Sequence, residues 1–79
     1  MKNPHLVAFG QTIRTIRKEK GLSQEAFADL AALDRSYMGC IERGEKNVTL
    51  TKIFQLSDAL KTTPVEIFAR LNLQVEMEP

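Results

Sequence analysis

Apolar residues recur every three or four positions through most of this chain, and this spacing restricts its fold more than any other feature. The first series, Leu6, Phe9, Ile13 and Ile16, places all four side chains on one stripe of an α-helix. Similar series follow, and no segment between residues 6 and 72 has the pattern of a β-strand. The sequence therefore predicts an all-α fold.

Helix start and stop residues divide these series into five helices. Polar residues precede the second to fifth helices as caps, because their side-chain oxygens accept hydrogen bonds from the free N–H groups of a first turn. The caps are Ser23, Asp34, Thr49 and Thr63, and the stops are Gly21 and Gly44. We expect one compact domain over residues 6–72, with a first helix over residues 6–19, and a short acidic tail over residues 73–79.

The second and third predicted helices are short and stand close together in the sequence. Only Ala32 and Leu33 separate the second helix from the Asp34 cap, so the two helices must meet at a tight angle. Ala28 and Ala31 are small enough to permit this close approach. Two short helices joined by a tight turn form a helix-turn-helix, which we place at residues 23–44.

The composition limits the chemistry that this chain can perform. One cysteine and one histidine among 79 residues exclude an intramolecular disulfide and a four-ligand Cys/His zinc site within one chain. No plausible Cys–His or Ser–His pair and no glycine-rich phosphate loop occur, so we expect neither an enzyme nor a metal or cofactor. No apolar run nears the ~20 residues of a membrane span. The N-terminus lacks the apolar stretch of a signal peptide, and we expect a cytoplasmic protein with no membrane partner.

The charges are unevenly distributed along the chain. Residues 1–52 contain nine lysines and arginines against six acidic residues, whereas residues 53–79 contain two against four. The basic excess lies in the part that contains the helix-turn-helix, where a polyanion would dock. An ordinary solvated surface explains the same distribution, so the charges alone do not decide between these interpretations.

Residues 22–44 closely resemble the helix-turn-helix of the Cro/C1 repressor family, also called the XRE family. The shared residues are Ser23 and Gln24 at the start of the second helix, Ala28, Met38 and Ile41 at apolar positions, and Glu42, Arg43 and Gly44 at the end of the third. The resemblance covers residues 9–71 and implies a five-helix, lambda-repressor-like domain. One departure is Ala32, where the family often has glycine and another residue adopts the turn at some cost.

Within this family, residues 33–37 and 41–43 look most like the controller proteins of restriction–modification systems. The resemblance implies a transcription regulator that binds double-stranded DNA at a specific sequence, as a homodimer on a near-palindromic operator. RNA polymerase is a further candidate partner, which the protein would block or recruit. Antitoxins and prophage regulators share parts of the pattern. The alternative is therefore an antitoxin, or another protein-interaction module, that neutralises a partner protein chiefly through residues 72–79.

In this family the third helix lies in the major groove, so its outward side chains are the candidate base contacts. They are Arg35, Ser36, Tyr37, Gly39 and Cys40. Arg35 is the foremost, because a guanidinium can donate two hydrogen bonds to one guanine, although it could instead pair with Asp34 or Glu42. For the other four residues, an alternative to base contact stays open. Ser36 could be exposed without a role, and Tyr37 could be a half-buried aromatic residue. Gly39 could allow close packing on the second helix, and Cys40 could be a small apolar residue that fills space.

Phosphate contacts are expected from residues on either side of these positions. The candidates are Ser23, Gln24, Arg43, Lys46, Asn47 and Lys52. Gln24 resembles the glutamine with which the family clamps a phosphate. Lys52 stands in the first turn of a helix, the unfavourable end for a cation, which points to a use outside the monomer.

Two further sets have structural roles. Arg17 and Glu42 resemble the internal ion pair of the family, which ties the first helix to the end of the third. The fifth helix is apolar around most of its circumference, more than a small core absorbs, so we expect a two-fold dimer contact there. Its residues would be Ile67, Phe68, Leu71 and Leu73. The alternative is that this helix only completes the core of the monomer.

Overall fold

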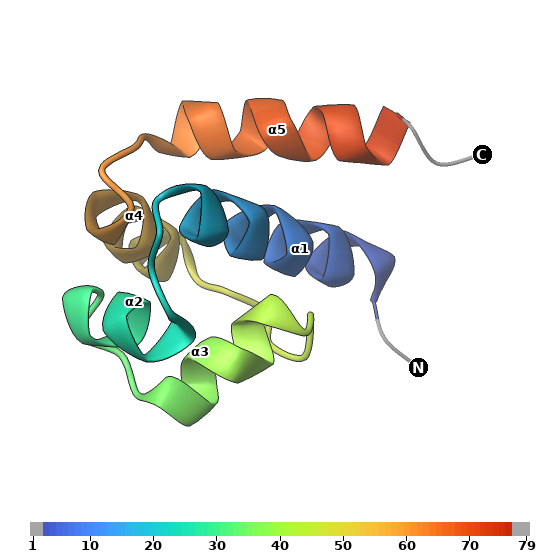
Figure 1. Ribbon diagram of the computed structural model, residues 1–79. Coiled ribbons are helices and arrows are strands. Elements are labelled where there is room, and N and C mark those ends of the chain that lie inside the picture. The colour runs from blue at the N-terminus through green and yellow to red at the C-terminus, as the bar shows by residue number, and fades with distance from the viewer. Residues whose placement is uncertain (1–2, 77–79) are drawn as a thin grey trace.

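The computed structural model describes residues 3–76, and this part of the chain forms five α-helices and no strand, which confirms the predicted all-α fold. The helices are α1 (Pro4–Glu19), α2 (Gln24–Leu30), α3 (Arg35–Glu42), α4 (Leu50–Ala59) and α5 (Pro64–Glu76). In Figure 1, α5 lies along one side of α1, α3 lies on the other side, and α2 and α4 stand at one end. The helix-turn-helix of α2 and α3 is thus held against α1.

The predicted caps all begin helices. Each accepts a hydrogen bond from a backbone N–H of the first turn: Ala26 N to Ser23 Oγ at 3.0 Å, and Tyr37 N to Asp34 Oδ2, Lys52 N to Thr49 Oγ1 and Glu66 N to Thr63 Oγ1, each at 3.2 Å. Two ends differ from expectation. Asn3 caps α1 through His5 N at 2.8 Å, so α1 starts at Pro4 instead of residue 6. The backbone of α5 stays helical to Glu76, beyond the boundary expected at residue 72.

The first four helices end in the same turn. The residue after each C-cap has a positive φ, namely Gly21 (73°), Ala32 (57°), Gly44 (76°) and Lys61 (55°). The next N–H then donates back across the last helical turn, as in Leu22 N to Arg17 O at 3.1 Å and Leu33 N to Ala28 O at 2.9 Å. This bonding satisfies helix-end carbonyls and fixes the angle at which the chain leaves each helix.

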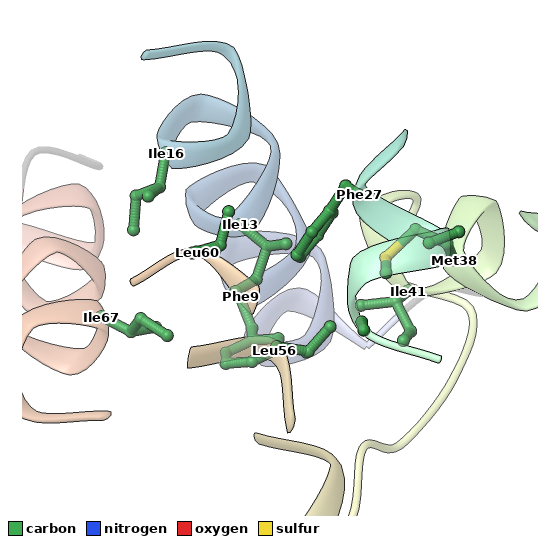
Figure 2. Packing of buried hydrophobic residues seen from close by; sticks show 11 residues of the cluster. Phe9, Ile13, Ile16, Phe27, Met38, Ile41, Leu56, Leu60 and Ile67 are labelled. Carbon is green, nitrogen blue, oxygen red and sulfur yellow. The ribbon is translucent and has the colours of Figure 1, made fainter. Parts of the chain in front are cut away.

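The core draws buried apolar side chains from all five helices (Figure 2). In α3 these are Met38 and Ile41, with exposed fractions of 0% and 1%. Removing a side chain of this size from water contributes about 1.5–3 kcal/mol. Because both point inward, they fix the rotation of α3 about its axis, and Arg35 and Ser36 remain exposed on its outer side.

The close contact between α1 and α3 depends on Gly10, a residue that no sequence pattern singled out. A Cβ at Gly10 would overlap the carbonyl oxygens of Ile41 and Glu42, so only glycine lets the two backbones approach this closely. The sequence expectation for Ile67 was wrong. This side chain is fully buried in the core, because it is the part of the α5 circumference that faces inward, and it cannot reach a partner subunit.

Candidate nucleic-acid interface

Residues from α2, α3 and the turn after α3 form one shallow, open hollow, which we call the α3 surface. Its lining consists of Gln24, Arg35, Ser36, Gly39, Cys40 and Arg43. All six were predicted as DNA contacts, four of them for bases and two for phosphates. The fold brings them together because the inward anchors of α3 turn these positions outward beside the start of α2.

Arg35 is exposed near the start of α3, and its guanidinium faces an acidic residue of α2. Its Nη1 lies 3.3 Å from Glu25 Oε2, and the two side chains are 66% and 67% exposed. Neither Asp34 nor Glu42, the partners considered from the sequence, is the one found. An ion pair this exposed is typically worth about 0.2–1 kcal/mol, so Arg35 can exchange Glu25 for another partner at little cost.

Arg43 follows the last residue of α3 and is held more firmly. Its Nε donates to Glu45 Oε2 at 3.0 Å and its Nη2 to Glu45 Oε1 at 3.2 Å, a two-pronged contact that the sequence analysis missed. Nη2 also lies 3.6 Å from Cys40 Sγ. Hydrogen bonding to the Glu45 carboxylate raises the pKa of Arg43 above its ordinary value.

Gly39 forms the floor of the α3 surface. A Cβ there would stand 2.9 Å from Arg43 Nη1 and 3.5 Å from Gln24 Oε1. The nearer neighbour is Arg43, and Gln24 of α2 is only at ordinary van der Waals distance, so close packing on α2 does not account for the glycine. The missing side chain gives Arg43 the room to lie across α3.

A buried network fixes the α3 surface from behind. Arg17 donates from Nε to Glu42 Oε2 at 2.7 Å and from Nη2 to Glu42 Oε1 at 3.0 Å, which is the ion pair expected between α1 and α3. Gln24 Nε2 adds a third hydrogen bond to Glu42 Oε1 at 3.1 Å. Arg17 Nη1 reaches Leu22 O at 2.9 Å. One buried carboxylate thus joins α1, α3 and the start of α2.

The remaining predicted contacts do not line the α3 surface, and Asn47 lines a different, apolar hollow. Tyr37 is half-buried and packs against the core, and Lys52 Nζ lies 5.8 Å from the centre of its ring. Lys52 therefore has a use inside the monomer, a cation–π contact, which the sequence did not indicate. Lys46 and Asn47 are exposed in the turn between α3 and α4. Ser23 is exposed, and its hydroxyl caps α2.

A second, apolar surface lies where α5 meets α1 and α4. Phe68 is 43% exposed and its ring centroid lies 6.1 Å from that of Phe9. Phe68 and Leu71 line an apolar hollow whose other members are His5, Leu6, Phe9, Asn47, Val48 and Ile53. Phe54 of α4 is also 50% exposed, which the sequence did not single out. The Leu73 side chain, expected in a dimer contact, lies outside the described residues.

The helices of the described part of the chain include none with the length and hydropathy of a membrane span. Among the side chains that the structure describes, no group of three or more His, Cys, Asp or Glu residues is arranged to hold a metal ion.

Comparison with known proteins places this geometry beside DNA-binding regulators. Residues 13–67 match the family described as Helix-turn-helix. The control protein C.SmaI of Serratia marcescens is 38% identical over 66 residues, which cover 84% of this chain and 79% of that protein. The crystal structure of the restriction-modification controller protein C.AhdI from Aeromonas hydrophila superposes with a TM-score of 0.78 and 54% identity over 80% of this chain and 96% of that one.

A third similar protein has been solved on DNA. The controller protein C.Esp1396I, as a tetramer in complex with its natural 35 base-pair operator, superposes with a TM-score of 0.87 and 31% identity. The match covers 94% of this chain and 97% of that one.

Proposed function

This chain belongs to the helix-turn-helix family, and we propose that it regulates transcription by binding DNA at a specific sequence, as a restriction–modification controller protein. One observation carries the proposal: α3 is anchored by Met38 and Ile41 so that Arg35 and its outward neighbours form an exposed surface beside the start of α2. The likeness to a controller protein solved on its operator supports the same mode of binding. Such a regulator acts in the cytoplasm.

In this proposal α3 enters the major groove. Arg35 exchanges Glu25 for the O6 and N7 atoms of a guanine, and Ser36, Tyr37, Gly39 and Cys40 lie against neighbouring bases. The phosphates on either side are bound by side chains around the α3 surface and by the N–H groups at the start of α2. These side chains are Ser23, Gln24, Arg43, Lys46, Asn47 and Lys52.

The regulator acts as a homodimer through the apolar surface of Phe68 and Leu71, with Leu73 as the third candidate. A two-fold axis there would set the two α3 helices one helical turn of DNA apart, about 34 Å, on a near-palindromic operator. A dimer bound over or beside a promoter would block RNA polymerase or recruit it.

The test begins by selecting a preferred duplex from a random library with the purified full chain. Arg35→Ala should weaken binding to that duplex about 5- to 150-fold and relax its base preference, because a bidentate guanine contact is worth about 1–3 kcal/mol. Lys46→Ala should weaken binding to all duplexes similarly and flatten the salt dependence by about 0.9 in log–log slope. Lys18→Ala, on an exposed face of α1, is the control and should leave both the affinity for DNA and its salt dependence unchanged.

Two results would contradict parts of this proposal. A wild-type protein that binds no duplex at low ionic strength would remove the DNA-binding function itself. Equal losses for Arg35→Ala on the selected and the random duplex would remove the base-reading role of Arg35 and leave the function standing.

A further inference from the structure

Arg43, one of the proposed phosphate contacts, is already bound by a carboxylate of its own chain. The Glu45 oxygens lie 3.0 and 3.2 Å from two different guanidinium nitrogens of Arg43. A phosphate would bind the same donors in the same two-pronged way. Glu45 therefore occupies the site on Arg43 that DNA would need.

The backbone fixes this carboxylate in place. Glu45 follows the positive-φ residue Gly44, and its N–H donates to Cys40 O at 2.9 Å, which ties it to the last turn of α3. Its side chain starts from a defined point, and 38% of it remains exposed. The C-terminal turn of α3 thus fixes the position of Glu45 in the free protein.

The bound guanidinium lies on the surface that would face DNA. Gly39 leaves the space that it occupies, with a Cβ position only 2.9 Å from Arg43 Nη1, and Cys40 Sγ lies on its other side. Glu45 also brings a negative charge to the edge of that surface. A phosphate approaching Arg43 meets a neutralised cation and a nearby like charge.

We propose that Glu45 is an affinity-determining residue that competes with the DNA backbone for Arg43. The inference rests on the proposed function. In the free protein Glu45 holds Arg43 across α3, and a duplex gains the Arg43 contact only by displacing the carboxylate. The cost is the same at every sequence, so Glu45 lowers the overall affinity and its salt dependence without choosing bases.

The experiment measures binding of the full chain to a fluorescently labelled duplex of random sequence by anisotropy at several salt concentrations. Glu45→Gln should bind about two- to fivefold more tightly, the range expected for releasing an exposed ion pair. Its log–log salt slope should steepen by up to about 0.9, the value of one additional phosphate neutralised.

Glu66→Gln is the matched control. It removes the same charge from the first turn of α5, which lies on the side of α1 away from α3 (Figure 1). It changes the net charge of the chain as Glu45→Gln does. It should therefore change the affinity for DNA only by the small amount that the altered net charge produces.

A double-mutant cycle with Arg43→Gln decides whether the effect passes through Arg43. In the Arg43→Gln background, Glu45→Gln should tighten binding no more than Glu66→Gln does. A gain that is undiminished without Arg43, or a Glu45→Gln variant that binds no more tightly than Glu66→Gln, would overturn the inference while the wild type still binds DNA. A wild type that binds no duplex would overturn the proposed function as well.

Discussion

At the scale of single residues, an ion pair between arginine and glutamate has a different role when it is buried than when it is exposed. Arg17 and Glu42 are buried together, and each finds further hydrogen bonds that offset the loss of water. Arg35 and Glu25 face solvent, where the ion pair is weak and easily exchanged. The first pair holds the molecule together, whereas the second leaves an arginine available.

Breaking the buried pair should be far more costly than breaking the exposed one. Arg17→Met leaves the Glu42 carboxylate buried without its cation and should lower the free energy of unfolding by about 3–5 kcal/mol. That is a large share of the roughly 5–15 kcal/mol of a typical domain. Urea denaturation followed by circular dichroism measures it. Glu25→Gln serves as the comparison and should change the free energy by less than about 1 kcal/mol, and similar losses in the two variants would disprove this account.

The partners of single side chains were the least predictable from the sequence. The caps of Ser23, Asp34, Thr49 and Thr63 were predicted because a capping residue and its N–H partner are three positions apart in the chain. Arg35 finds Glu25 ten positions away across the tight turn, which depends on how α2 crosses α3. A local sequence pattern does not specify the angle between α2 and α3.

At the scale of the elements, the repeated left-handed turn sets the helix ends, yet only two of its four positions are glycine. Gly21 and Gly44 were predicted as stops for this reason. Ala32 and Lys61 adopt the same conformation with a Cβ that disfavours it. The departure of Ala32 from the family pattern therefore has a local energetic cost.

Ala32→Gly should stabilise the protein. It removes the strain of a positive φ, partly offset by the greater freedom of glycine in the unfolded chain, and we expect a gain of about 0.5–1 kcal/mol. The urea midpoint should rise with an unchanged m-value. Ala69→Gly, the same substitution at an exposed position inside α5, should instead destabilise by about 1 kcal/mol. A loss of stability for Ala32→Gly would contradict the strain.

Some features of the helices depend on tertiary contacts, which helix propensities do not describe. Glycine inside a helix is unfavourable in isolation, so Gly10 makes sense only once the α3 carbonyls beside it are known. The apolar pattern of α5 placed Ile67 and Phe68 in one group. Packing on α1 and α4 separates them, since Ile67 is fully buried and Phe68 is 43% exposed.

At the scale of the whole molecule, an ion pair joins helices that are distant in sequence. Arg70 of α5 donates to Glu19 at the end of α1, with Nη1 3.1 Å from Oε1 and Nη2 2.5 Å from Oε2. This hydrogen bonding lowers the pKa of Glu19 below its ordinary value of 4.5. Its stabilisation is therefore present above that value and is lost as the pH falls through the lowered pKa.

The consequence is a pH-dependent difference between the wild type and Arg70→Met. The wild type should have the higher Tm near neutral pH, and the difference should shrink as the pH falls from about 4.5 through the lowered pKa of Glu19, below which Glu19 is protonated in both proteins. Thermal unfolding from about pH 7 to pH 3 measures it. A difference in Tm that stays constant over this range would show that Glu19 does not mediate the effect.

The apolar surface of Phe68 predicts the state of assembly. Phe68→Ala should weaken dimerisation about tenfold or more, because a central aromatic side chain commonly contributes over 1 kcal/mol to an interface. Sedimentation velocity over a concentration series measures it. Leu30→Ala removes a similarly exposed apolar side chain from α2 and should leave the dimer intact. A wild type that is monomeric at every concentration would place the dimer contact in doubt.

The anchoring of α3 has a consequence for how such a regulator acquires new targets. Met38, Ile41 and the Arg17–Glu42–Gln24 network set the orientation of this helix, and the outward side chains of Arg35, Ser36 and Cys40 take no part in them. In the proposed mode of binding, exchanging Arg35, Ser36 or Cys40 should change the sequence preference with little effect on stability. The same fold could thus recognise a different DNA sequence after substitution of a few surface residues, with no compensating change in the core.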